Sequence, residues 1–286
     1  MKQRPHTINV GGKLLSLSPA VVMGIINITP DSFYAKSKVN DEESLRQRVL
    51  QIINDGGKII DVGAYSSRPG AKNVSQEEEM TRLRHSLKII QEASFDLPIS
   101  VDTFRSDVAK MCVEEYGVNI INDISAGQLD NNMFETVARL QVPYVIMHMR
   151  GNPQTMQENT QYQDLIADMF LYFSQKINRL QDLGVNDIII DPGFGFSKTL
   201  DQNYKLLQRL EDFREFDLPI LIGVSRKSMI YKYLGGEPED ALNGTSIINT
   251  IALLKGANIL RVHDVKACAD AIKIIEKMND NTTRYD

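Results

Sequence analysis

Cysteine is scarce in this chain of 286 residues, and several features that would assign it to a special class of protein are missing. Its two cysteines, Cys112 and Cys268, each lie in a stretch typical of a helix, which favours core thiols in a reducing compartment over a disulfide framework. No run approaches the roughly 18 apolar residues that span a bilayer, and the opening residues lack the apolar centre of a signal peptide. We therefore expect a cytoplasmic protein.

A surplus of basic residues is also missing. The net charge of −5 argues against a nucleic-acid partner or an anionic membrane surface, because both favour a basic patch. Small anionic ligands stay open, since nearby side chains set the field inside a pocket. The length suits one domain over 1–286, because a single (β/α)8 barrel would take up nearly all of it.

Short apolar runs recur along the chain, and nearly every one ends in a polar residue. They are rich in Ile and Val at successive positions, which is typical of strands buried on both faces of a parallel sheet. The runs are 21–27, 58–62, 98–102, 118–123, 142–148, 186–191, 218–225 and 257–263.

Helical patterns fill the intervals between these runs. Strands alternating with helices in this number indicate an α/β fold, the (β/α)8 TIM barrel, whereas an open doubly wound sheet usually has fewer strands. Within residues 1–18, TINV-GG-KLLSL predicts a β-hairpin that would cover the bottom of the barrel, and 279–286 should form a frayed tail. Ser75 and Glu78 form the pattern of a capping box. The helical stretches include 43–55, 164–183, 203–213, 244–255 and 266–277.

The polar residues that end the strands are the first functional signal. A single Asp after a strand is most often a helix N-cap, but polar residues at all eight ends argue for a shared function. In a barrel the carboxyl ends of the strands meet at one mouth, where the chemistry lies. These residues are Asn27, Asp61, Asp102, Asn122, Asp123, His148, Asp191, Ser225, Arg226, Lys227, Arg261 and His263.

The types of side chain narrow the ligand. Asp102, Asn122 and Asp191 offer acceptors and a donor suited to a flat heterocycle with amidine-like N–H groups, because a carboxylate accepts two parallel hydrogen bonds. Lys227 would face a ring carbonyl or ring nitrogen. Arg261 and His263 lie two residues apart and therefore face the same side of a strand.

Two loops add to this picture. Arg68, in the short segment 66–70, would complete a cationic rim for phosphate oxygens with Arg261 and His263, although a plain surface turn is an equal interpretation of that segment by itself. The glycines and phenylalanines of 191–198 would allow close approach to a ligand and stacking on it.

Motifs for other chemistries are missing. The sequence has neither a P-loop nor a strand-linked dinucleotide fingerprint, and its Cys and His residues form no metal-ligand pattern. His148 lies between two methionines, which favours a packed pocket wall over a ligand.

Taken together, these motifs resemble the dihydropteroate synthases, a family of pterin-binding barrels, in order from about residue 20 to 275. The combination is far more specific than any one string. The matching strings are MGIINITPDSF (23–33), IIDVGAYSSRPGA (59–71), ISVDTFR (99–105), IINDISAG (120–127), MHMRGNPQTMQ (147–157), DPGFGFSKT (191–199), GVSRKSMI (223–230) and RVHDV (261–265).

The resemblance implies a reaction and its partners. The pyrophosphate ester of 6-hydroxymethyl-7,8-dihydropterin would condense with p-aminobenzoate, giving 7,8-dihydropteroate and pyrophosphate, on a homodimer with Mg2+ as cofactor. Four residues, Asp102, Asp191, Lys227 and Arg261, would be catalytic. The pterin would bind Asp102, Asn122, Asp191 and Lys227 above Met147; pyrophosphate would bind Asn27, Arg261 and His263, with Asn27 also holding Mg2+; and p-aminobenzoate, with competing sulfonamides, would bind Ser67, Arg68, Pro69, Phe196 and Ser225.

The sequence departs from the family in two loops. Tyr34-Ala35-Lys36-Ser37 replaces Ser-Asp-Gly-Gly, so the family's loop aspartate is missing, and we expect Asp31 or a neighbouring carboxylate to supply its charge. Tyr65 stands where the family has Glu, and Ser67 where it has Thr. Two alternatives therefore stay open: a pterin-binding paralogue without turnover, and a corrinoid-linked methyltetrahydrofolate methyltransferase barrel.

Overall fold

Eight parallel strands form the centre of the fold in the computed structural model, which describes residues 6–28, 38–66, 73–93 and 96–282. Their order is β8-β7-β6-β5-β4-β3-β10-β9, and β8 meets β9 through one parallel bridge between Ile190 and Ile220. The predicted TIM barrel is therefore confirmed. It is nearly closed, and only this single bridge joins its first and last strands in the sheet order. The strands are β3 (Val21–Asn27), β4 (Ile59–Gly63), β5 (Ile99–Asp102), β6 (Ile120–Asp123), β7 (Tyr144–Met147), β8 (Ile188–Asp191), β9 (Leu221–Ile222) and β10 (Ile259–Val262).

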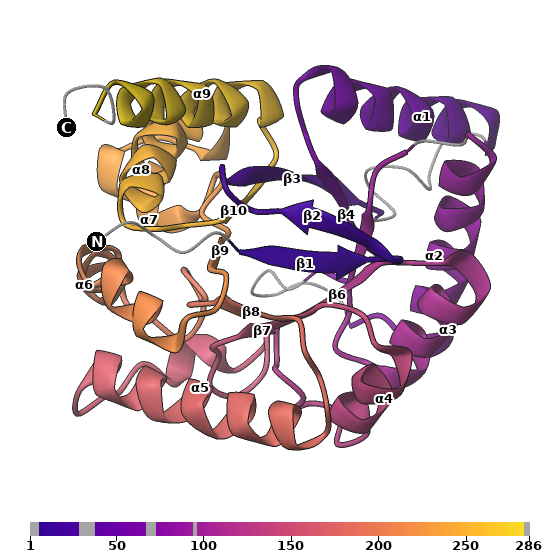
Figure 1. Ribbon diagram of the computed structural model, residues 1–286, viewed down its shortest axis with the longest axis horizontal. Coiled ribbons are helices and arrows are strands. Elements are labelled where there is room, and N and C mark those ends of the chain that lie inside the picture. The colour runs from indigo at the N-terminus through magenta and orange to yellow at the C-terminus, as the bar shows by residue number, and fades with distance from the viewer. Residues whose placement is uncertain (1–5, 29–37, 67–72, 94–95, 283–286) are drawn as a thin grey trace.

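Helices surround the strands as a ring (Figure 1). The side chains of β4, β6, β7 and β8 are buried throughout, because one face points into the barrel and the other meets the helices. The helices are α1 (Lys38–Asn54), α2 (Gln76–Glu92), α3 (Ser106–Tyr116), α4 (Met133–Leu140), α5 (Leu165–Asp182), α6 (Leu200–Gln208), α7 (Ser228–Leu234), α8 (Leu242–Leu254) and α9 (Val265–Thr282), with 3-10 turns at Met156–Glu158, Leu210–Phe216 and Pro238–Ala241.

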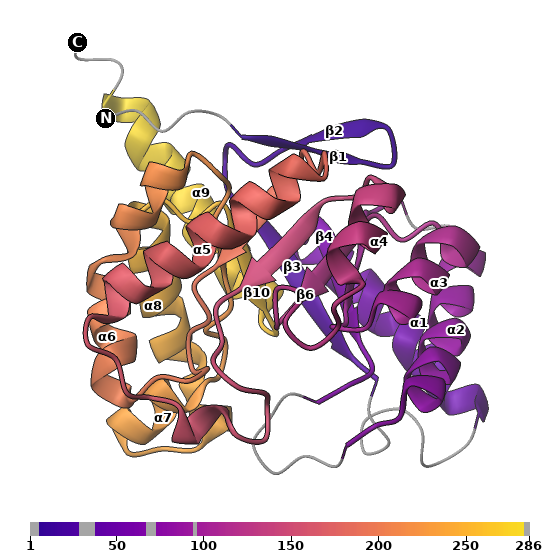
Figure 2. The ribbon, with the colours of Figure 1, turned by 90° about the horizontal axis from the view of Figure 1, so that it is seen from below.

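The predicted hairpin covers the bottom of the barrel. β1 (Thr7–Val10) pairs antiparallel with β2 (Lys13–Ser16), and Figure 2 shows the pair lying across the end of the barrel opposite the loops that follow the strands. Ile8, Val10 and Leu17 are buried in one cluster with the inward-facing residues of the barrel strands. This apolar cap closes the amino-terminal end, so the mouth at the opposite end is the open one.

Two local predictions need correction. Ser75 caps α2 by accepting from the backbone N–H of Glu78, but the Glu78 carboxylate contacts Arg82 instead of completing the capping box, because Arg82 lies one turn further along the same face. The expected tail is also partly helical, since α9 continues to Thr282. Both cysteines are buried free thiols, as expected. None of the described helices is long and apolar enough to cross a membrane.

Candidate functional site

The polar ends of the strands meet at the barrel mouth as predicted, and an ionic group lies at their centre. Arg261 of β10 donates from Nε to Asp61 Oδ2 of β4 at 2.6 Å and from NH2 to Asp102 Oδ2 of β5 at 2.8 Å. Asn122 of β6 donates to the same Asp61 oxygen at 3.4 Å. Asp61 is completely buried, and its Oδ1 has no hydrogen-bond partner among the residues that the structure describes. These contacts join four strands into one polar network.

Burial perturbs the titration of this network. It raises the pKa of Asp102 to about 7, where the charge of Asp61 adds to the rise and Arg261 opposes it. Burial opposes the charge of Arg261 as well, but Asp61 and Asp102 together raise its pKa above the ordinary value. Asp102 can therefore gain or lose a proton near neutral pH, while Arg261 stays charged.

Asp191 and Lys227 form the other side of the mouth. The pKa of Asp191 is raised by burial, and its Oδ1 accepts from the backbone N–H of Gly193 at 2.8 Å. Burial lowers the pKa of Lys227 to about 8, although the Asp191 carboxylate opposes this. The Lys227 ammonium donates to the carbonyl of Phe194 and lies 4.5 Å from the centre of the Phe196 ring. Such a pair can offer both an acceptor and a donor to a heterocycle.

An apolar cluster separate from the barrel core lies beside these charges. Met147 and Phe196, both predicted to contact substrate, belong to it. Phe104, two residues beyond Asp102, packs against the cluster and is half-buried. Of the two phenylalanines predicted to stack on a ligand, Phe196 belongs to this cluster, whereas Phe194 is completely buried in the barrel core. The other members are Ile124, Met149 and Met156.

The predicted cationic rim is wrong in part. Burial, followed by the charge of Arg261, lowers the pKa of His263 to about 4, so its imidazole is neutral at physiological pH. The imidazole Nδ1 of His263 lies 3.1 Å from the hydroxyl oxygen of Ser225, and the same oxygen accepts from the backbone N–H of His263. Arg261 lies in the ion-paired centre rather than at the edge, because two carboxylates hold it there. Among the described residues of the predicted rim, an approaching anion therefore meets a guanidinium that is already paired and an imidazole that is neutral before binding.

The loop of residues 192–199 is held by a buried lysine that sequence reasoning did not select. Lys198 is 3% exposed, and its Nζ contacts His148 Nδ1 and the carbonyls of Gly193 and Phe196, each at 3.0 Å. Gly193 has a φ of +72°, and a Cβ there would lie 2.2 Å from the His148 carbonyl oxygen. Its glycine is thus required by the packing of the chain on itself. His148 is a buried wall residue, as predicted.

Asp61 and Asp123, two more strand-end carboxylates, received no role from the sequence, and the structure separates them. Asp61 belongs to the ionic network, and its position near the carboxyl end of β4 was the available signal. Asp123 instead accepts from the Tyr144 hydroxyl at 2.6 Å and from the backbone of Ser125 and Gly127. It therefore stabilises the turn after β6.

Several predicted site residues lie outside the described residues. They are Ser67, Arg68 and Pro69, together with Asp31 and the segment 34–37. Asn27 ends β3, in register with Gly63 of β4, at the same mouth. Among the described residues, no group of three or more His, Cys, Asp or Glu is arranged to hold a metal ion.

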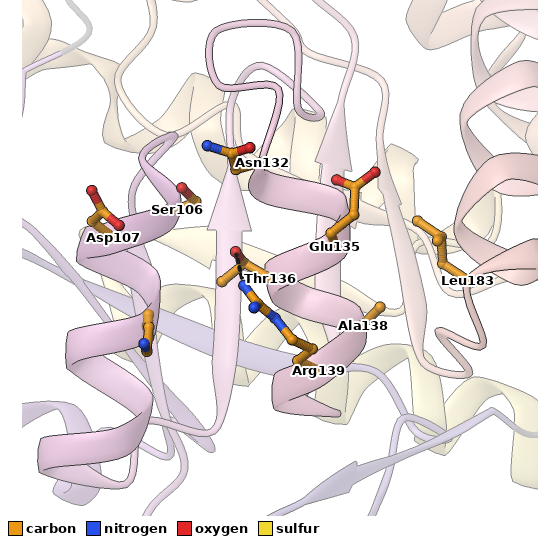
Figure 3. A pocket seen from close by; sticks show the side chains of 9 residues that line it. Ser106, Asp107, Asn132, Glu135, Thr136, Ala138, Arg139 and Leu183 are labelled. Carbon is orange, nitrogen blue, oxygen red and sulfur yellow. Dashed lines mark hydrogen bonds between the residues drawn. The ribbon is translucent and has the colours of Figure 1, made fainter.

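A pocket of about 510 Å3 lies away from the mouth, between α3 and α4 on the outside of the barrel (Figure 3). Ser106, Asp107 and Asn132 lie at one end and Arg139 at the other, where its guanidinium donates to Thr136. No residue predicted for the site lines it. Buried charges and an apolar surface converge at the mouth instead, which makes the mouth the candidate site.

Comparison with known proteins identifies the family of this chain. The family described as "pterin binding enzyme" matches residues 23–263. The dihydropteroate synthase of Escherichia coli K12 is 42% identical over 267 residues, covering 93% of this chain and 94% of that protein. A crystal structure of Yersinia pestis dihydropteroate synthase in a sulfonamide drug complex superposes with a TM-score of 0.88 at 36% identity, over 96% of this chain and 100% of that one. The enzyme from Vibrio fischeri gives 0.84 at 40% identity, over 96% and 98%. This chain therefore belongs to the pterin-binding enzyme family, among its dihydropteroate synthases.

Proposed function

We propose that this mouth condenses 6-hydroxymethyl-7,8-dihydropterin pyrophosphate with p-aminobenzoate, yielding 7,8-dihydropteroate and pyrophosphate. The observation that carries the proposal is the group of opposed charges at the ends of β5, β8 and β10, next to the cluster that holds Met147 and Phe196. Buried charges of both signs beside an apolar surface suit a flat, polar-edged ring.

The pterin would lie over Met147 with its edge toward the charges. Asp191 and Asn122 supply acceptors for ring N–H groups, and Lys227 supplies a donor for a ring oxygen or nitrogen. Asp102 reaches the same space but shares one oxygen with Arg261. Its ionised form would accept from the pterin and stabilise positive charge on it, so the raised pKa of Asp102 ties binding to pH.

The chemistry needs no protein nucleophile. The bond between the pterin methylene carbon and the pyrophosphate oxygen breaks, its electron pair leaves with pyrophosphate, and the electron-rich dihydropterin carries the resulting positive charge. The amine of p-aminobenzoate then bonds to that carbon and loses a proton. Arg261 and His263 would stabilise the leaving group, while Asp102 and Asp191 stabilise the cation.

The amine would bind beside the loop after β8, which carries Phe196. The resemblance assigns this subsite to Phe196 and Ser225 together with 67–69. Phe196 faces the Lys227 ammonium, which the proposal assigns to the pterin, and Ser225 contacts His263, which it assigns to pyrophosphate. An aromatic amine held there would be near the methylene carbon that it attacks.

Magnesium fits the proposed pyrophosphate position through Asn27. The amide oxygen of Asn27 is a hard donor at the mouth, and Mg2+ commonly takes one or two protein oxygens together with water and substrate phosphates. When bound, Mg2+ would neutralise charge on the pyrophosphate.

The proposal also includes a homodimer and a cytoplasmic location. α7 and α8 present large apolar side chains to solvent, with Tyr233 65%, Leu234 63%, Ile247 52% and Leu254 57% exposed. Sedimentation should give a dimer that Ile247→Asp weakens and Leu171→Asp, on exposed α5, does not; a monomer at all concentrations would refute this interface. The free thiols support a reducing compartment.

The direct test is pyrophosphate release from the purified protein with the dihydropterin pyrophosphate and Mg2+, with and without p-aminobenzoate. Release that depends on p-aminobenzoate, with dihydropteroate formed, is the expected result. Tight binding of the dihydropterin without release from folded protein would refute catalysis and identify a pterin-binding paralogue.

A further inference from the structure

Tyr65, which stands where the family carries glutamate, makes contacts on two sides of the mouth. It follows β4 directly and is half-buried. Its hydroxyl accepts from the Gln154 side-chain amide at 2.9 Å, and Gln154 belongs to the loop after β7. Its ring meets Phe104, which follows β5, edge to face, with centres 5.1 Å apart and planes at 89°. One side chain thus joins loops that follow three different strands.

The Tyr65 ring lies against an arginine that is held in place by a buried carboxylate. Glu79 of α2 is completely buried, accepts from the Thr103 hydroxyl at 2.7 Å and forms an ion pair with Arg105. The guanidinium of Arg105 lies 5.6 Å from the centre of the Tyr65 ring and also donates to the carbonyl of Val74 at 2.7 Å. A buried carboxylate therefore fixes the cation against which the phenol ring lies.

Phe104 also lies against Arg105, and it packs on the apolar cluster of the mouth. Arg105 lies 4.9 Å from the centre of its ring, and the ring packs on the cluster that contains Met147 and Phe196. The apolar surface of the mouth therefore runs from Phe196 to Phe104 and on to Tyr65.

Gln154, the partner of Tyr65, lies in the loop after β7, which is hydrogen-bonded to the loop after β8. Gln157, three residues after Gln154, donates to the carbonyl of Gly195 at 3.1 Å. The Arg150 backbone and the Ser197 hydroxyl exchange two hydrogen bonds, at 2.8 and 2.9 Å. The loop after β7 is thus tied to the loop that carries Phe196. Within the described residues, the Gln154–Tyr65 hydrogen bond is the side-chain bond that continues this bracing to the loop after β4.

We propose that Tyr65 is a positioning residue for the aromatic amine substrate. Its hydrogen bond to Gln154 holds the loop after β7, and through that loop the loop after β8, and so fixes the position of Phe196 in the amine subsite. The inference rests on the proposed reaction and deepens it. Arg105 already pairs with Glu79, so its guanidinium meets Tyr65 through the ring face. Pterin binding should be insensitive to Tyr65, since the network of Asp102 and Arg261 lies on the strand ends themselves.

The test compares Michaelis constants of the full-length enzyme for its two substrates. Tyr65→Phe removes the hydroxyl and keeps the ring, and Gln154→Leu removes the donor. Each should raise KM for p-aminobenzoate about two- to tenfold, the range of one exposed hydrogen bond, and leave KM for the dihydropterin pyrophosphate within about twofold. The double variant should be no worse than either single one, because both remove the same bond.

Two further variants separate positioning from loss of structure. Gln154→Glu should restore a low KM for p-aminobenzoate, because a phenol can donate to a carboxylate. Gln91→Leu is the matched control, since its amide also donates one exposed hydrogen bond, to the Tyr116 carbonyl at 3.0 Å, at the end of α2 away from the mouth. It should change neither constant. Thermal unfolding should show every variant folded.

Several results would overturn the inference. An unchanged KM for p-aminobenzoate in Tyr65→Phe, additive effects in the double variant, or an equal rise for both substrates would each refute it while the wild-type enzyme still turns over. Wild-type protein that forms no dihydropteroate would instead refute the proposed function, so the two failures are distinguishable.

Discussion

Replacing Asp61 with asparagine would test whether the ionic network sets the chemistry of the mouth. Asp61→Asn keeps the shape of the side chain and removes its charge. In the wild type this carboxylate is completely buried, 2.6 Å from Arg261 Nε, while Arg261 also contacts Asp102. The change therefore removes one of the two anions that hold the guanidinium.

The expected loss of stability follows from burial. Breaking a buried ion pair from one side costs about 3 to 5 kcal/mol. An amide oxygen still accepts from Arg261, and Asp102 still pairs with it, so we expect about 2 to 3 kcal/mol. For a chain of this size that corresponds to a fall of roughly 4 to 10 °C in Tm. Differential scanning calorimetry would measure it.

The pH dependence gives a sharper result. The pKa of Asp102 is about 7, raised first by burial and further by the charge of Asp61. If ionised Asp102 serves the reaction, kcat/KM for the dihydropterin pyrophosphate rises as pH increases through about 7. Removing the charge of Asp61 lowers the pKa of Asp102, so this acidic limb should move down by about half to one pH unit. The variant should lose less activity between pH 8 and pH 6 than the wild type.

A control at the other end of the barrel makes the test specific. Asp187 accepts from the backbone of Asn9 in the hairpin, far from the mouth, so Asp187→Asn removes one carboxylate without touching the network. Its acidic limb should stay in place. If the acidic limb of the kcat/KM profile of a normally folded Asp61→Asn variant stays at the wild-type pH or moves to a higher pH, the coupling between Asp61 and Asp102 is refuted.

Three further predictions concern the surrounding structure. Gly193→Ala should lower the free energy of unfolding by more than about 2 kcal/mol, since its Cβ would lie 2.2 Å from a carbonyl oxygen, whereas Gly235→Ala, with φ +77° and open space, should cost about 1 kcal/mol; equal losses in urea titrations would contradict this. Tyr144→Phe should cost about 1 to 2 kcal/mol and leave both Michaelis constants unchanged, because Asp123 keeps its backbone donors; a raised KM would place Asp123 in the site. His263, with a pKa of about 4, should take up a proton when pyrophosphate binds, so affinity falls with rising pH more steeply in the wild type than in His263→Gln; calorimetry in two buffers would detect the proton, and identical slopes would exclude it.

The sequence determined the architecture and the face on which the chemistry lies. Apolar runs ending in polar residues predicted the strands, and their alternation with helices predicted the barrel, because a strand buried on both faces appears in the sequence as a short continuous apolar run. The same pattern placed Asp102, Asn122 and Asp191 at one mouth, since all parallel strands of a barrel end on the same side. The hairpin was predictable from its two-residue turn.

Tertiary structure decided which of these residues meet and in what state. Arg261 and Asp61 are 200 residues apart, and only the pairing of β10 with β3 brings them into contact. Burial lowers the pKa of His263 and leaves its imidazole neutral. Burial also lowers the pKa of Lys198 to about 7, in a loop that the sequence indicated only as a ligand-binding segment. Tyr65 gains its partners from two other loops. A sequence specifies which groups end each strand, but the protonation and pairing of those groups depend on distances and burial that exist only once the barrel has closed.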